Sequence, residues 1–226
     1  MPLNSDTEVD LAAEPADAGI EQVPASLYRH HLYSARHLAD LACTLEKDHA
    51  GTSDQELIRR HRAYVIGSVL SASAFLESSI NELYLEVQDH IANGNPENRR
   101  RVLAVPAHFW SAVARPPILH KYQLALVVAD AEPFDEGRAP FRDADLLVAL
   151  RDGLVHGRPE WRDSHGRRQN LARRLRAKFP HNALAREGDP EFPDQLLGAG
   201  CAMWAVRVAE KFSNDFCHRI AIPARG

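Results

Sequence analysis

Apolar residues recur every three or four positions along much of this chain, which is the spacing of one face of an α-helix. The longest such pattern begins at Asp54 and continues to about Ala92, where an Asn-Gly-Asn-Pro sequence ends it. The pattern predicts a core helix of about ten turns. Its predicted inner face consists of Ile58, Val65, Val69, Ala72, Leu76, Ile80, Leu83, Val87 and Ile91.

The same helical spacing predicts five further helices, at residues 25–50, 119–129, 143–155, 166–179 and 194–220. The last of these is expected to be one long helix, with Leu197, Cys201, Trp204, Val208, Phe212 and Phe216 facing the core. Strand-like alternation and β-α-β order are not found, so the predicted fold class is an all-α helical bundle.

Residues 1–24 differ in composition from the rest, with six acidic residues, three prolines and no Lys or Arg. This composition predicts a disordered acidic tail before a single helical domain at residues 25–226. A signal or transit peptide is not indicated, and no window approaches eighteen uninterrupted apolar residues. We therefore expect a cytoplasmic protein that does not associate with membranes.

Net charge, cysteine content and the absence of certain known motifs disfavour several classes of protein. The formal net charge is -4, so any nucleic-acid binding must come from a local basic surface. Cys43, Cys201 and Cys217 form no CxxC pair, and we expect reduced, mostly buried thiols. Because HExxH, GxGxxG and GxxxxGK[ST] sequences do not occur, a zinc hydrolase, a dinucleotide enzyme and a P-loop ATPase are disfavoured. We expect neither a metal nor a cofactor.

The stretch ALRDGLVHGRPEW, residues 149–161, begins like an apolar helix and then carries Arg151, Asp152, Gly153, His156 and Gly157. Each interior glycine costs about 1 kcal/mol relative to alanine, so helix stability does not explain this sequence. Arginine offers a permanent cation suited to phosphate, and histidine titrates near neutral pH. Together they suit phosphodiester chemistry without a metal.

Two geometric expectations follow for this stretch. Asp152 and His156 lie four positions apart, so the carboxylate is expected to orient the imidazole. Arg151 and His156 lie 140° apart around an ideal helix, so they do not share a face. The alternative is structural: Gly157 ends the helix, His156 is a cation favoured by the helix dipole, and Arg151 is a surface residue.

Further residues are candidates for substrate binding. Glu77 and Asn81 are one turn apart on the flank of the long apolar face, and we expect them to point toward Arg151 and hold it; the alternative is an ordinary interhelix polar pair. Arg158 directly follows the motif. A basic stretch without acids then predicts a phosphate-binding surface, which comprises Arg167, Arg168, Arg173, Arg174, Arg176, Lys178 and Arg186. The alternative is a solvated helix face, but such faces usually carry charges of both signs.

The residues from Arg151 to His156 match the R-x(4–6)-H signature of the HEPN superfamily (higher eukaryotes and prokaryotes nucleotide-binding), including a polar residue directly after the arginine. The FLESSINELYLE sequence at residues 75–86 resembles the long helix that precedes the motif helix in HEPN-like bacterial proteins. VHGRPEW and LGAGCAMWAVRVAEKF also resemble uncharacterised bacterial proteins of this kind. The resemblance covers roughly residues 57–220.

The resemblance implies an up-down helical bundle with extra helices, and a homodimer in which two motifs form one cleft. It implies metal-independent endoribonuclease activity on RNA, with Arg151 as the phosphate ligand, His156 as the general base or acid, and Asp152 orienting the site. An effector of a toxin–antitoxin or antiphage defence system, with an antitoxin or regulatory protein as partner, fits this reading. The alternative is a catalytically inactive HEPN module that binds nucleotide, RNA or a protein.

Overall fold

The structure, a computed structural model, describes residues 26–92, 117–156 and 167–225. Within these ranges it contains helices and no strand, which confirms the predicted all-α class. The predicted acidic tail and Arg158 lie outside the described residues. The elements are α1 (Leu27–His49), α2 (Gln55–Ala92), α6 (Ile118–Val128), α7 (Phe141–His156), α8 (Arg167–Arg176), the short turn η2 (Glu191–Gln195) and α9 (Ala199–Arg219).

Helices α1 and α2 form a hairpin whose turn is explained by its sequence. Gly51 has a φ of +76°, a backbone conformation that glycine adopts without the steric cost of a side chain. Asp54 then caps α2, because its Oδ1 accepts hydrogen bonds from the backbone N–H groups of Glu56 (2.8 Å) and Leu57 (3.4 Å). The predicted start of this helix is therefore confirmed.

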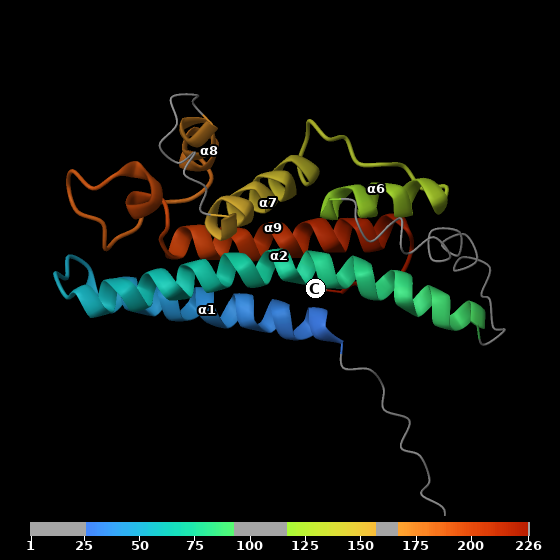
Figure 1. Ribbon diagram of the computed structural model, residues 1–226, viewed down its shortest axis with the longest axis horizontal. Helices are drawn as coiled ribbons and strands as arrows, with labels where there is room; N and C mark the ends of the chain where they lie inside the picture. Colours follow the sequence, from blue (N-terminus) through green and yellow to red (C-terminus); the bar gives the residue numbers. More distant parts are fainter. Residues whose placement is uncertain (1–25, 93–116, 157–166, 226) are drawn as a thin grey trace, which may run out of the picture.

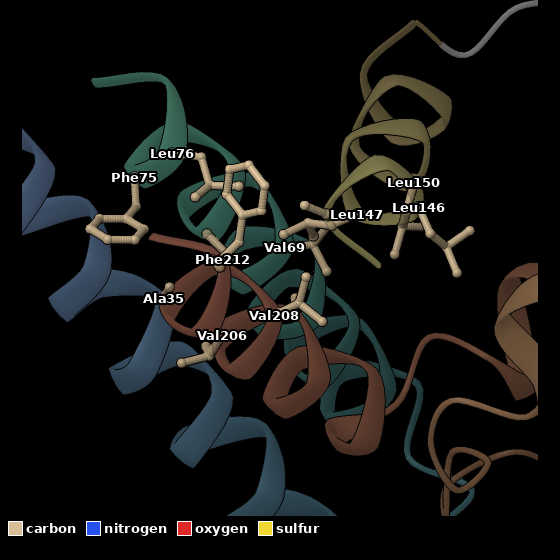
Figure 2. Close-up of a cluster of buried hydrophobic side chains, with 14 of the residues drawn as sticks. Ala35, Val69, Phe75, Leu76, Leu146, Leu147, Leu150, Val206, Val208 and Phe212 are labelled. Carbon is tan, nitrogen blue, oxygen red and sulfur yellow. The ribbon is translucent and has the colours of Figure 1, made fainter. Parts of the chain in front are cut away.

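Three long helices, α1, α2 and α9, pack side by side, and α6 and α7 cover the other side of α2 and α9 (Figure 1). Helix α8 packs on α7. The bundle interior is apolar, and Figure 2 shows Val69 and Leu76 of α2 close to Leu147 of α7 and to Val208 and Phe212 of α9. These residues are buried, as are all six residues predicted for the inner face of the last helix.

The predicted last helix, residues 194–220, is wrong at its beginning. Glu191–Gln195 form a separate short turn in which Phe192 is extended (φ −122°, ψ 129°), and α9 begins only at Ala199. Gly198 between them is extended, with φ −118° and ψ −179°. A Cβ on Gly198 would lie 2.5 Å from the Cα of Asn182, so this position has no room for a side chain. The chain therefore turns here instead of continuing one helix.

Among the described residues one helical segment, Gln55–Glu86, is long and apolar enough to cross a membrane by length and composition alone. Half of its most apolar window is buried inside the structure, where it packs against α1 and α9. The core helix of a soluble bundle passes the same test, so this finding is weak evidence for a membrane span. The three cysteines, all within the described ranges, form no disulfide.

Candidate functional site

Helix α7 places the predicted motif where its apolar face ends. Phe141, Ala144, Leu147 and Leu150 recur every three residues, and all are buried in the bundle. From Arg151 onward the helix no longer buries whole side chains, and Asp152, Val155 and His156 are exposed. The motif therefore occupies the last turns of a helix that is anchored by the four residues before it.

Arg151 is held by two carboxylates, and its side chain is 24% exposed. Its Nη2 donates to Oε2 of Glu77 on α2 at 3.2 Å, and its Nη1 donates to Oδ1 of Asp152 at 2.9 Å. The predicted contact between Glu77 and Arg151 is thus present. A guanidinium held from two helices has a fixed orientation, and the N–H groups that these two bonds do not use can still donate to a third group. We call Glu77, Arg151, Asp152 and His156 the α7 site.

His156 is exposed in the last turn of α7. None of the described residues forms a hydrogen bond with its ring. The expected pairing with Asp152 is therefore not formed in this structure, because that carboxylate binds the adjacent Arg151 instead. Residues 151–156 are all helical, so the 140° separation of Arg151 and His156 expected from the sequence applies here. Within one copy, the two side chains leave the helix in different directions.

Asn81 does not contact Arg151 as predicted. Its Oδ1 instead accepts a hydrogen bond from Nζ of Lys121 on α6, at 2.9 Å. Lys121 is only 2% exposed. Burial lowers the pKa of its ammonium group, while the nearby Glu77 carboxylate opposes that shift. Sequence reasoning missed Lys121, because a lysine in an apolar helix is normally assigned to the solvent face.

The basic stretch is less positive than its sequence indicates. Arg174 pairs with Asp145 at 3.0 Å, and Lys178 pairs with Asp143 at 2.6 Å, so both partners come from α7. Arg176 makes two hydrogen bonds with Glu191, which lower the pKa of that carboxyl group. Acids from other segments thus balance much of the charge.

Three of the remaining basic candidates are Arg167, Arg168 and Arg173. Arg173 is exposed. Arg167 and Arg168 form the first turn of α8, but their side chains lie outside the described residues. The phosphate-binding role of Arg167 and Arg168 therefore stays a prediction.

Within the described ranges no three His, Cys, Asp or Glu side chains are grouped so that they could hold a metal ion. Comparisons of the sequence with protein-family models, with curated proteins and with solved structures found no match. The assignment of a function therefore depends on the geometry of the α7 site and on the sequence motif that it contains.

Proposed function

We propose that this chain is a metal-independent endoribonuclease of HEPN type. The observation that carries the proposal is the placement of Arg151 and His156 in the last turns of α7, with the guanidinium anchored by Glu77 and the imidazole exposed. An anchored arginine can bind a phosphate in a defined orientation. An exposed histidine can exchange protons with a substrate.

In the proposed reaction, Arg151 donates hydrogen bonds to the non-bridging oxygens of one RNA phosphate and stabilises the negative charge of the transition state. His156 accepts the proton of the neighbouring ribose 2'-hydroxyl. The O2'–P bond forms and the P–O5' bond breaks, with the proton required by the leaving oxygen supplied by the imidazolium or by solvent. The products are a 2',3'-cyclic phosphate and a 5'-hydroxyl, and no metal or cofactor takes part.

The proposal includes a homodimer with two-fold symmetry. Arg151 and His156 point apart on one helix, so one copy does not direct both side chains at the same phosphate. A two-fold axis near the end of α7 would allow the arginine of one protomer to face the histidine of the other. A role as a toxin or antiphage effector, restrained by a partner protein, is consistent with such an enzyme.

A second candidate is a catalytically inactive module that binds RNA, nucleotide or a protein. One observation favours it: both terminal nitrogens of Arg151 already bind carboxylates, from Glu77 and Asp152. In an active enzyme an incoming phosphate must share the guanidinium with these groups or displace one of them. A module that does not bind phosphate through Arg151 needs no such rearrangement.

The test is incubation of the purified protein with RNA in EDTA, for the wild type and for His156→Ala. The matched control is His218→Ala, which removes an exposed histidine from the last turn of α9. We expect the wild type and His218→Ala to produce 2',3'-cyclic phosphate ends, and His156→Ala to produce none while keeping its helical circular dichroism. RNA binding without cleavage by the wild type would favour the inactive module.

A further inference from the structure

Helix α6 buries an ammonium group beside the α7 site. Lys121 lies in an apolar helix and is 2% exposed, and its neighbours Ile118, Leu119, Tyr122, Ala125 and Leu126 are also buried. Burying a charged group costs free energy that even a well-made hydrogen bond only partly recovers. A methionine of similar length would fill the same space without that cost. The charge therefore needs a reason other than the stability of the helix.

The hydrogen bond from Lys121 to Asn81 places the ammonium group near the α7 site. Lys121 Nζ donates to Asn81 Oδ1 at 2.9 Å, and Asn81 lies one turn after Glu77 on α2, so the ammonium group lies near the Glu77 carboxylate. The negative charge of Glu77 accordingly opposes the lowering of the lysine pKa by burial. Glu77 in turn accepts the hydrogen bond from Arg151. The Glu77 carboxylate thus binds the half-buried cation on α7 and lies near the buried cation on α6.

We propose that Lys121 is a positioning residue for Arg151, acting through the Glu77 carboxylate. Glu77 is roughly half exposed, so its side chain is able to rotate toward solvent. Lys121 does not follow it, because burial and the bond to Asn81 fix the ammonium group. The fixed charge keeps the carboxylate beside α7, and the guanidinium consequently keeps one orientation. The effect on catalysis rests on the proposed function, whereas the effect on Arg151 itself does not.

The first test measures how fast phenylglyoxal modifies Arg151, followed by peptide mass spectrometry, because this readout needs no nuclease activity. We expect Lys121→Met to raise the rate by roughly threefold or more, as the carboxylate no longer holds the guanidinium. Lys121→Arg, which keeps the charge, should stay near the wild-type rate. An unchanged rate in Lys121→Met would overturn the proposal.

The matched control is Tyr84→Phe. The Tyr84 hydroxyl donates to the backbone oxygen of Lys121 at 2.9 Å, so its removal disturbs the same place without removing the charge. We expect a lower melting temperature and an unchanged rate of Arg151 modification. If Lys121→Met does not fold, Asn81→Asp serves instead, since a second carboxylate beside Lys121 releases Glu77 and should also raise the rate. No increase in that variant would likewise overturn the proposal.

The second test is kinetic. We expect Lys121→Met to lower kcat by about tenfold or more with KM changed far less, since orientation matters most in the transition state. The double variant Glu77→Gln/Lys121→Met should cleave no more slowly than Glu77→Gln alone, because both changes act on one link. If the two substitutions lowered the cleavage rate additively, Lys121 would not act through Glu77. If the wild type cuts no RNA but Arg151 labelling rises in Lys121→Met, the proposed function fails and the positioning role stands.

Discussion

Two histidines of this protein, His61 and His156, lie in opposite surroundings. The His61 side chain is 2% exposed, and its Nε2 lies 2.9 Å from Oε1 of Glu46. The same oxygen accepts the backbone N–H of Ala199 at 2.6 Å. His156 is exposed, and no described residue binds its ring. We call Glu46, His61 and Ala199 the Glu46 junction.

The difference between these regions separates a structural histidine from a chemical one. A carboxylate only accepts hydrogen bonds, so His61 carries its proton on Nε2 and keeps it in a bond that joins α1 to α2. Through Ala199 the same carboxylate also joins the N-terminus of α9, where a negative charge is favoured. A proton held in this way is not available to a substrate. Of these two rings, the exposed one of His156 meets that requirement.

The largest effect is expected at the α7 site. Arg151→Lys keeps the positive charge but loses the planar group that binds Glu77 and Asp152 together. We expect RNA cleavage to fall by roughly 100-fold or more, which is typical of the loss of a transition-state donor, while stability changes by less than about 1 kcal/mol. Single-turnover cleavage and urea unfolding measure the two effects. If Arg151→Lys cleaved RNA at the wild-type rate, the assignment of Arg151 to the transition state would be contradicted.

The opposite pattern is expected at the Glu46 junction. Glu46→Ala leaves the buried His61 and the N–H of Ala199 without their acceptor, so we expect a loss of roughly 2–4 kcal/mol in the free energy of unfolding. Urea unfolding measures this loss. The control is Glu210→Ala, which breaks a more exposed pair with Arg36 and should cost less than about 1 kcal/mol. Equal losses in the two variants would contradict the structural role of the junction.

A somewhat smaller loss in the free energy of unfolding is expected at Gly198, which lies beside Glu46. An alanine Cβ at Gly198 would lie 2.5 Å from Asn182 Cα and 2.8 Å from Glu46 Oε1, so the backbone must shift. Gly198→Ala should therefore cost roughly 1–3 kcal/mol, measured as a lower urea midpoint. At the exposed Gly137 a Cβ would meet only a side-chain oxygen of Asp135, at 3.3 Å, and Gly137→Ala should change the midpoint little. A tolerated Gly198→Ala would mean that this end packs more loosely than the structure describes.

The smallest effect concerns alkaline pH. Burial raises the pKa of the Cys201 thiol, near the start of α9. The unfolded thiol ionises from about pH 8.5 while the folded one stays protonated, so the folded state binds more protons and stability falls as pH rises. Between pH 7.5 and 10 this thiol should account for a loss of roughly 1–2 kcal/mol.

The contribution of this thiol is isolated by a comparison of two proteins. The pKa of Lys121 is lowered by burial, which gives a slope of opposite sign near pH 10 in both proteins. Urea unfolding of the wild type and of Cys201→Ala across this pH range therefore separates the thiol from the lysine. Parallel curves would show that the Cys201 thiol is not sealed from solvent.

Much of the fold could be predicted from local sequence signals. Asp54 marks the start of α2, and the repeating apolar residues identify the buried faces of α2, α7 and α9. The start of the last helix could not be predicted in the same way. Gly198 is extended because Asn182 and Glu46 surround it, and these residues are distant in the sequence.

The part of the candidate site that could be predicted is the part indicated by the position of a residue on a helix face. Glu77 lies on the flank of the apolar face of α2, and this position correctly indicated its contact with Arg151. Lys121 was missed because its burial arises from the packing of α6 on α2. The basic stretch was judged too positive because the acids that neutralise it, such as Asp145 and Glu191, belong to other segments.

The most direct test compares His61→Gln with His156→Gln in single-turnover RNA cleavage in EDTA, under conditions where both variants are folded. Glutamine can still donate to Glu46, so we expect His61→Gln to cleave within about threefold of the wild type. His156→Gln should lose roughly 100-fold or more, because the amide does not titrate. Equal losses in both variants, or cleavage by His156→Gln at the wild-type rate, would contradict the assignment of the exposed histidine to catalysis.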